Sequence, residues 1–462
     1  MKKIIISVVL IATIGLVGPK IIGGGVNQKI DDFVATVNQT PGYQVTVVNQ
    51  ESSWTSTVAT IKVGLDPTLL GDMATNPIAS ELLDDLSINF YVTAQHGPFL
   101  TLNGPGLGLL AVKADVKETL LREKLIYSED KPLYSLAINI GFLGGASFSD
   151  KLQAFKLREA ETVSMSGWNG KGSMSSNHFK YKGKMDAFTA ESGLEKLALK
   201  SVAIDINTEA SLLSTLTSPF YDSVADFTIG SILFDDSADG KVALENINIS
   251  GASQVSKDGQ LMDMNINYGV EQVSIPNFNA SNLVLKTQLV NLEKGFMTAL
   301  QNASNNLIEM EQLAELFNTS ILAQLQASPE FNISELSGSV GEGSFAGNML
   351  VKLTGIDQMP AYLVDPSFWL SKLVVDSRLE IEKTMAIQIA EKVLINQLKN
   401  NNTDQMNQAE IESLAREQAE ITVDMLMVQG MVTVNAKNNL ELTFSVKGGN
   451  VVLNGNPIPL PF

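Results

Sequence analysis

The chain contains no cysteine and only two histidines among its 462 residues. Without cysteine there is no disulfide, no cysteine-bound zinc or iron–sulfur cluster and no thiol catalysis. The absence leaves the cellular compartment open, because a chain with a large core needs no covalent staples. The two histidines, His96 and His178, lie in none of the spacings that bind metals, such as His-Glu-x-x-His. We therefore predict no metal site and no cofactor.

Positive charge is scarce as well. The sequence has 32 lysines and arginines against 50 aspartates and glutamates, which gives a net charge of −18. Because nucleic-acid binding depends on basic residues that release counterions from phosphates, this balance excludes nucleic acid as a partner. The chain is nevertheless 44% hydrophobic, which is enough to bury a large core.

Motifs that carry chemistry are few, and the three closest approaches each lack a required residue. Gly145-Ala146-Ser147-Phe148-Ser149 begins like a nucleophile elbow but lacks its final glycine. The glycine-rich run 104–108 has Leu109 where a dinucleotide-binding loop has its third glycine. The run 235–240 begins like a calcium loop, yet Asn246 replaces the bidentate carboxylate at position 12. We therefore predict no catalytic residues and a protein that is not an enzyme.

Residues 1–25 have the composition of a targeting segment. Met1-Lys2-Lys3 precedes an uncharged run from Ile4 to Pro19, and three glycines occupy positions 23–25. The apolar run is short for a bilayer span, so a cleaved signal peptide competes with a retained anchor. We favour the uncleaved anchor, because no Ala-x-Ala cleavage site is present. The two lysines ahead of the run favour a cytoplasmic N-terminus, with the rest of the chain outside.

Hydrophobic periodicity divides the remainder into three regions. Residues 26–40 carry apolar side chains at helical spacing and predict a short amphipathic connecting helix. In residues 41–290 apolar and polar side chains alternate, which predicts half-buried antiparallel strands. Residues 291–462 mix both patterns. The segments in which the alternation is clearest begin at Ala59, Val202, Met262, Leu283, Met349, Leu373 and Leu440.

Turn and helix signals complete the expected architecture. Asp258-Gly259 and Gly448-Gly449-Asn450 each separate two strand-like runs and predict hairpins. Helical patterns occupy residues 292–325, as a helical hairpin or one bent helix, and residues 384–398 with 405–427. We therefore predict an α+β protein, in which a large antiparallel β-rich ectodomain with two inserted helical regions follows an N-terminal membrane helix.

One short motif links the sequence to a known family. The run His96-Gly97-Pro98-Phe99 stands about 100 residues after the N-terminal segment, and a strand pair around residues 45–65 precedes it. Together with the closing hairpin near residues 440–455, these features make the chain resemble the YdgA-like family of uncharacterised Gram-negative envelope proteins. The resemblance implies a single-pass inner-membrane protein with its bulk in the periplasm, and it supplies no catalytic residues.

The motif has a structural and a functional interpretation. Gly97 and Pro98 suit a turn, Phe99 can bury against the sheet, and His96 can hydrogen-bond the turn. Alternatively, His96 contacts a ligand or responds to pH.

Two hypotheses for the function remain. The first is a non-enzymatic envelope scaffold or binding module for another envelope component. The second is a lipid-handling protein with an apolar groove along a curved sheet, where methionines adapt to acyl chains. The expected partners are thus the inner membrane, through the N-terminal segment, and either a lipid or an envelope protein.

Overall fold

We describe the fold from a computed structural model of the chain. It describes residues 34–35, 37–38, 43–53, 55–65, 87–97, 99–117, 119–158, 162–193, 195–236, 240–276, 278–305, 320–360, 362, 365–401 and 407–459. The predicted membrane segment, residues 1–25, lies outside these ranges. In the described part of the chain, no helix has both the length and the apolar character needed to cross a membrane. The chain forms two compact units: unit 1 comprises residues 1–238 and 297–314, and unit 2 comprises residues 239–296 and 315–462.

Unit 1 is built from strands, as the alternating pattern predicts. Its strands are β1 (Tyr43–Ser52), β2 (Ser56–Leu65), β3 (Ile88–His96), β4 (Phe99–Leu100), β5 (Gly106–Leu107), β6 (Leu110–Val116), β7 (Leu125–Ile126), β8 (Tyr134–Ile140), β9 (Ala146–Leu152), β10 (Phe155–Leu157), β11 (Thr162–Met165), β12 (Trp168–Met174), β13 (Phe179–Ser192), β14 (Glu195–Thr208) and β15 (Ser223–Asp236). Two short described helices, α4 (Thr119–Lys124) and α5 (Leu212–Thr217), connect strands of this unit.

The main strands of unit 1 form an antiparallel meander. β1, β2, β3, β6, β8, β9, β12, β13, β14 and β15 pair in that order. The far half of β13 pairs instead with β11, which continues through β10 to β7. Most pairings therefore join strands that follow each other in the chain.

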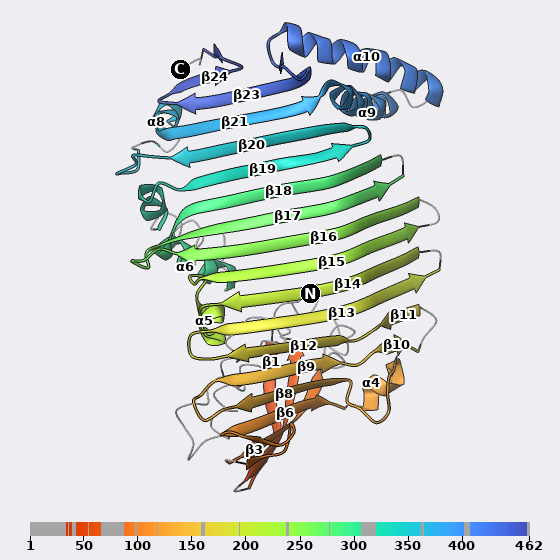
Figure 1. Ribbon diagram of the computed structural model, residues 1–462, viewed down its shortest axis with the longest axis vertical. Helices are drawn as coiled ribbons and strands as arrows, with labels where there is room; N and C mark the ends of the chain where they lie inside the picture. Colours follow the sequence, from red (N-terminus) through yellow and green to blue (C-terminus); the bar gives the residue numbers. More distant parts are fainter. Residues whose placement is uncertain are drawn as a thin grey trace. The chain divides into compact units, whose positions relative to one another are not determined.

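The unit 1 sheet covers its own apolar face. One hydrophobic core contains inward side chains of β1–β3, such as Val45, Ile61 and Val92, together with those of β8 and β13, such as Ile138 and Phe179. Figure 1 shows how this arises, because the β1–β2 hairpin crosses behind β8 and β9 instead of continuing alongside them. The predicted connecting helix joins the same core: residues 34–35 and 37–38 are helical, and Val37 is buried.

Glycines in the core face of β12 give room to aromatic rings. An ideal Cβ on Gly172 would lie 2.2 Å from Cζ of Phe148. Phe148 stacks on Phe179 and on Tyr181, with ring centroids 5.9 and 6.0 Å apart. Rings packed across strand glycines restore the side-chain contact that a glycine lacks. The three parallel rings thus depend on the missing side chain at position 172.

Unit 2 is a second antiparallel sheet with helices. Its strands are β16 (Gly240–Val255), β17 (Leu261–Ile275), β18 (Phe278–Glu293), β19 (Glu330–Val340), β20 (Gly343–Leu353), β21 (Leu373–Glu382), β22 (Thr433–Val434), β23 (Asn439–Lys447), β24 (Asn450–Leu453) and β25 (Asn456–Pro457). Its described helices are α8 (Pro366–Lys372), α9 (Lys383–Asn401) and α10 (Gln408–Val428), and residues 320–326 are helical as well. α6 (Lys294–Asn305) begins in unit 2 and continues into the segment 297–314 of unit 1.

The strands of unit 2 also follow chain order. β16 to β21 pair successively, β21 pairs with β23, and β23 pairs with β24. The hairpins predicted at Asp258-Gly259 and at Gly448-Gly449 are confirmed, since each connects two paired strands. Gly448 and Gly449 both have positive φ, at 57° and 82°, as a two-residue hairpin turn requires. The antiparallel β-rich, α+β architecture is thus confirmed, whereas the predicted boundary at residue 290 stays a prediction.

The predicted helical regions are also found. The pattern over 384–398 corresponds to α9, and the pattern over 405–427 corresponds to α10. α10 begins with a capping box, in which Asn407 and Glu410 bond to each other's backbone N–H groups. In the region 292–325, α6 and the helical residues 320–326 are described, and residues 306–319, which would show whether one bent helix or a helical hairpin forms, lie outside the described residues.

The aromatic packing across β12 predicts a penalty for a single methyl group. We expect Gly172→Ala to lower the free energy of unfolding by about 1–3 kcal/mol, because overpacking forces Phe148 off its position. Urea unfolding followed by tryptophan fluorescence measures this. Gly145→Ala is the matched control, since a Cβ there meets no atom within 4 Å. Equal stability of the two variants would contradict the role of the glycine.

Candidate functional site

The candidate site is the apolar face of the unit 2 sheet. Cross-strand register aligns its side chains into three neighbouring rows. The first row is Ser253, Met264, Leu289, Phe331, Val351, Val375, Val446 and Val451. The second row is Gly251, Ile266, Thr287, Ile333, Met349, Ser377, Phe444 and Leu453. The third row is Ile249, Tyr268, Leu285, Leu336, Gly347, Leu379 and Leu442.

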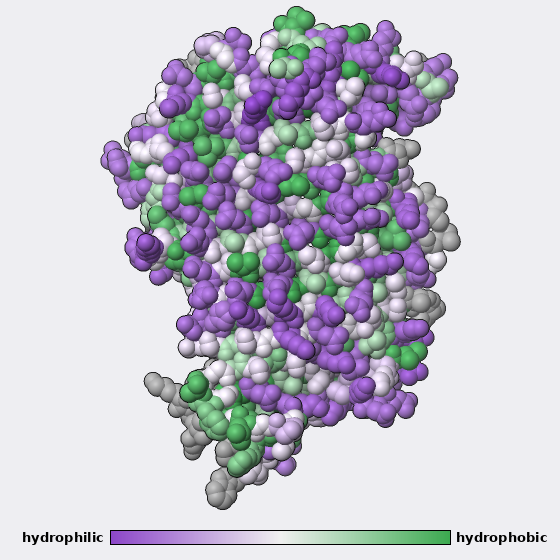
Figure 2. All heavy atoms as spheres, in the orientation of Figure 1, coloured by the Kyte–Doolittle hydropathy of each residue, from purple (hydrophilic) through white to green (hydrophobic). Residues whose placement is uncertain are grey.

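None of the residues in these rows is charged, whereas the opposite face of the same strands carries ion pairs. Lys286 lies 2.7 Å from Glu335, measured between the ammonium nitrogen and a carboxylate oxygen. Arg378 lies 2.8 Å from Glu441. Figure 2 shows one face of the molecule, on which hydrophilic side chains are interspersed with hydrophobic ones over these strands. Because successive side chains of a strand point to opposite faces, the alternation of apolar and polar residues gives this sheet one apolar face and one charged face.

The apolar face is only partly shielded from solvent. Tyr268 and Leu379 in the third row are 41% and 38% exposed. Most other apolar members of the rows are half-buried, and the fully buried ones, such as Val446 and Val451, lie towards the C-terminal end of the sheet. A sheet face of this composition is stable when a second layer covers it. Its residual exposure therefore indicates capacity for an additional apolar partner.

Helices flank the strands of unit 2 at both of their ends. The helical residues 320–326 are tied to the end of β18, because the amide of Gln324 bonds to the backbone of Asn291 and Glu293 at 2.8 Å each. At the other end, Met385 of α9 is buried against Gly343, and Lys392 lies 4.9 Å from the centre of the Phe278 ring. These contacts lie at strand ends, whereas the second and third rows run between them.

The dimensions of the face suit an elongated apolar molecule. Eight strands at roughly 4.8 Å spacing give a length of about 34 Å, and three rows give a width of about 14 Å. One leaflet of a bilayer's hydrocarbon core is about 15 Å thick, which is the reach of one acyl chain. The face is therefore long enough to hold an extended acyl chain along the direction that crosses the strands.

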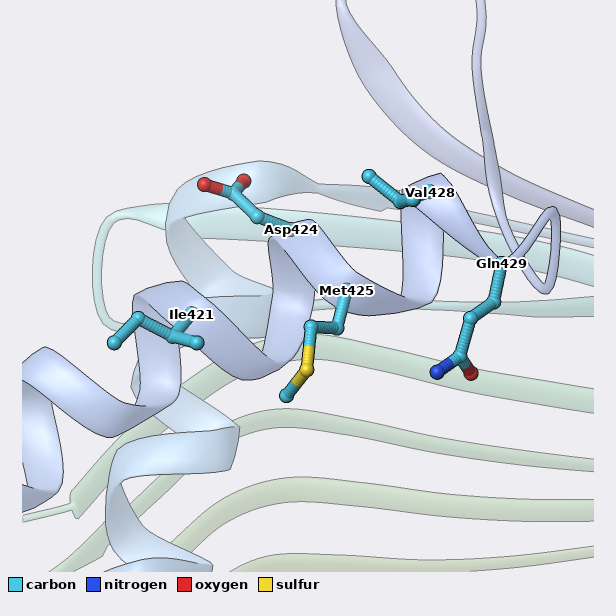
Figure 3. A pocket seen from close by; sticks show the side chains of 5 residues that line it. All are labelled: Ile421, Asp424, Met425, Val428 and Gln429. Carbon is cyan, nitrogen blue, oxygen red and sulfur yellow. The ribbon is translucent and has the colours of Figure 1, made fainter.

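A smaller apolar feature lies on α10. Its inner side buries Ile411, Ala415, Ala419 and Val423, spaced by four residues, so the outer side is left with Ile421, Met425 and Val428. Figure 3 shows Met425 and Gln429 on one side of the helix and Asp424 and Val428 on another. The residues line a shallow groove of about 350 Å³. Its volume is near the lower limit for ligand pockets, and the groove is open to solvent, so it does not enclose a drug-sized ligand.

The structure places the family motif at the end of β3 in unit 1. His96 is the last residue of β3, and its Nε2 lies 3.5 Å from Oγ1 of Thr57 on β2. Gly97 has a φ of +117°, which fits its predicted role in a turn. Pro98 lies outside the described residues. His96 thus contacts the neighbouring strand, in line with a structural role.

The expectation that Phe99 is buried is wrong. Its side chain is 75% exposed. The reason is that the short hairpin of β4 and β5 pairs Phe99 with Leu107, so both point outward, while Leu100 turns inward against Gly108. Sequence pattern alone did not reveal this, because a two-residue strand shows no periodicity.

Unit 1 also contains a buried acid that sequence reasoning missed. Asp150 occupies an inward position of β9 and is 2% exposed. The Tyr181 hydroxyl donates to its Oδ2 over 3.3 Å and accepts from the Trp168 indole N–H at 2.7 Å. An ideal Cβ on Gly170 would lie 1.9 Å from Oδ1 of Asp150, so only glycine leaves space for the carboxyl. Among the described residues, this Oδ1 has no hydrogen-bond partner.

Burial decides the protonation state of this acid. Desolvation raises the pKa of Asp150 to about 6, although the hydrogen bond from Tyr181 opposes the shift. Burial and the nearby Asp150 charge also raise the pKa values of Tyr134 and Tyr181. The cluster sits in the closed core of the sheet, where a substrate has no access. Asp150 is therefore a buried structural acid, and burial disfavours its charged form.

The other residues with chemical potential stay apart. His178 lies near the β12–β13 turn, with Nδ1 3.8 Å from a carboxylate oxygen of Glu209. Within the described ranges, no group of three or more histidines, aspartates and glutamates is arranged to hold a metal ion. The Gly104 loop, which has a φ of +107°, forms part of the turn between β4 and β5 and not a phosphate-binding loop before a helix.

The class defined by this architecture is a β-rich protein with large antiparallel sheets and, in unit 2, an apolar sheet face. A family model described as "Bacterial protein of unknown function (DUF945)" matches residues 1–461, and the chain belongs to this family. The chain is also 23% identical over 508 aligned residues to the protein YdgA of Escherichia coli (strain K12), which covers 100% of this chain and 95% of that protein. No solved structure matches it. The resemblance to the YdgA-like family is thus confirmed.

The raised pKa of Asp150 predicts that stability depends on pH. A carboxyl whose pKa is about 6 folded and 3.8 unfolded binds more protons in the folded state between these values. Stability therefore falls as pH rises from 4 to 6 and levels off above 6, a loss of about 3 kcal/mol from this group. We expect Asp150→Asn to remove this fall, measured by urea unfolding from pH 4 to 7.5. Parallel pH profiles for the two proteins would contradict it.

Proposed function

We propose that the protein is a non-enzymatic binding module of the bacterial envelope, and that the apolar face of unit 2 holds acyl chains of a lipid. The observation that supports this most directly is the set of three uncharged rows that cross seven or eight strands and remain partly exposed. An open apolar area of this size is unusual on a monomeric protein unless it binds something.

Several features favour an acyl chain over a protein partner on this face. The interior strands have both edges paired, so an added peptide strand finds no free backbone groups there. The rows contain only apolar and small uncharged side chains. Protein–protein interfaces, by contrast, usually include several direct hydrogen bonds and are enriched in arginine. Methionines 264 and 349 lie within the rows, and methionine adapts to flexible apolar ligands.

The location forms part of the same proposal. We take the N-terminal residues 1–25 as an uncleaved single-pass anchor in the inner membrane, with the bulk of the chain in the periplasm. The support is the sequence, in which two lysines precede the apolar run. A protein anchored in this membrane would lie next to the phospholipids that it binds.

A scaffold function is the second candidate, and the outer side of α10 favours it. Ile421, Met425 and Val428 are 51%, 49% and 88% exposed at helical spacing. Such a stripe fits an apolar groove on another envelope protein. In that case unit 2 is free of lipid, so the lipid content of the purified protein distinguishes the two functions.

The lipid proposal predicts bound lipid that depends on the apolar face. We expect full-length protein, exchanged into a lipid-free detergent and analysed by native mass spectrometry, to retain phospholipid. Met264→Glu should reduce the lipid-bound fraction at least about tenfold, because it puts a charge in the first row.

Asn265→Glu is the matched control. It adds the same charge to the neighbouring residue of β17, whose side chain lies on the polar face. This variant should bind lipid as the wild type does. A folded wild type without lipid, or equal loss in both variants, would contradict the lipid function.

The location makes a separate prediction. A reporter that is active only in the periplasm, such as alkaline phosphatase, should be active when fused after Phe462. A cytoplasmic reporter at the same position should stay inactive, since the two lysines at the N-terminus keep that end inside. The reverse pattern of activities would overturn the orientation.

A further inference from the structure

Two loops of unit 1 end in a cluster of exposed hydrophobic side chains, which we call the apolar tip. It consists of Phe99 and Leu107 on the β4–β5 hairpin and Phe142 and Leu143 in the β8–β9 turn. Their side chains are 75%, 67%, 54% and 101% exposed. Figure 2 shows hydrophobic side chains gathered at the lower end of the view, over the part of unit 1 that contains β3, β6 and β8 in Figure 1.

Backbone pairing brings the two loops together. Leu110 is aligned with Ile140 across β6 and β8, and the N–H of Leu109 donates to the carbonyl of Ile140 at 2.8 Å. The residues that precede Leu110 therefore extend beside those that follow Ile140. Phe99 is the cross-strand partner of Leu107, so it joins the same end.

The apolar tip is free of charge over a long stretch of sequence. No charged residue occurs from 97 to 112 or from 132 to 149. In a chain with 18% charged residues, stretches of this length would contain about three charges each on average. Charged residues at this end would have to be desolvated if the loops entered an apolar phase.

Several backbone groups of the loops are paired within the protein. The Gly141 N–H donates to the Gly145 carbonyl at 2.9 Å, and the Gly144 N–H donates to the Gly141 carbonyl at 3.0 Å. On the hairpin, the Gly97 N–H donates to the Leu109 carbonyl at 3.2 Å. Because these backbone groups already have hydrogen-bond partners, moving the loops from water into lipid costs less free energy.

We propose that the apolar tip inserts into the surface of a lipid bilayer, with Phe99, Leu107, Phe142 and Leu143 below the headgroups. A protein partner fits the observations less well. The four side chains offer roughly 500 Å², less than the about 800 Å² that each partner of a stable protein complex buries. The uncharged loops also lack the polar rim that gives such complexes their specificity. Insertion into a bilayer requires neither a contact area of this size nor a polar rim.

The chain's negative charge adds a preference among lipids. With a net charge of −18, the protein is repelled by anionic headgroups at low salt. Insertion through apolar contacts should therefore be at least as strong in neutral phosphatidylcholine as in membranes that contain phosphatidylglycerol. This separates it from electrostatic surface binding.

The absence of cysteine allows a direct test on the full-length protein. Leu143→Cys carries an NBD label at the apolar tip, and Ile126→Cys carries the same label on β7, at the other end of the unit 1 strands. Ile126 is also exposed, at 49%, so the label there starts in contact with water as well. The proteins are reconstituted with phosphatidylcholine vesicles that contain doxyl-labelled lipid, and NBD emission is measured.

We expect a blue shift and quenching by doxyl lipid at position 143 and neither at position 126. Phe99→Asp in the Leu143→Cys protein should move the equilibrium towards the withdrawn tip at least about tenfold, seen as lost quenching. Phe99 is exposed, so this change tests insertion and not folding.

Three results would overturn the proposal. The first is equal emission from the two labels, which shows a tip that stays in water. The second is quenching that requires anionic lipid and disappears with salt. The third is a blue shift without vesicles that grows with protein concentration, which assigns the tip to contacts between copies of the chain. The test does not involve unit 2, so its outcome is independent of the proposed lipid-binding face.

Discussion

An antiparallel sheet with one apolar face has to hide that face from water, and the rest of this structure follows from how each unit meets the requirement. In unit 1 the sheet turns back on itself, so that β1–β3 cover the strands from β6 to β13 and form a closed core. In unit 2 the helices contact the strand ends, and the second and third rows stay partly exposed. A closed core gives stability, whereas a partly open face gives a surface that can bind. The difference between the units thus suggests which of them carries the binding function.

The core of unit 1 contains an arrangement that pure hydrophobic packing does not require. Asp150 lies among aromatic residues, and glycines in β12 leave room for its carboxyl and for the ring of Phe148. Burying a carboxyl costs free energy unless it is protonated or well paired. Hydrogen bonds that link Trp168, Tyr181 and Asp150 fix the rings in one orientation. Such a hydrogen-bonded network favours one arrangement of the core side chains over others that apolar packing alone would allow.

Most of the fold was predictable from the sequence, and the sites were not. Alternation along the strands is local, so β14, β17, β21 and β23 were predicted, as were the hairpins at Asp258-Gly259 and Gly448-Gly449. The three rows depend on register between strands, and a bulge shifts the register between β18 and β19 next to Asn282, which has a positive φ. The exposure of Phe99 depends on a two-residue strand with no period. The long uncharged stretches around residues 97–112 and 132–149 were a visible signal of the apolar tip, but their proximity arises only from the pairing of β6 with β8.

The order of the strands has a consequence for how the chain acquires its structure. Because most pairings join neighbours in the sequence, each new hairpin closes a short loop and costs little chain entropy. A sheet of this kind can form strand by strand while the polypeptide is being synthesised or exported, before the C-terminal strands are available. Each intermediate then presents a newly formed unpaired edge in addition to that of β1, for which β2 is the paired neighbour among the described strands. An unpaired edge is a place where two unfinished chains can join. When strands are added one after another from the N-terminus, only the strand formed last exposes this new edge.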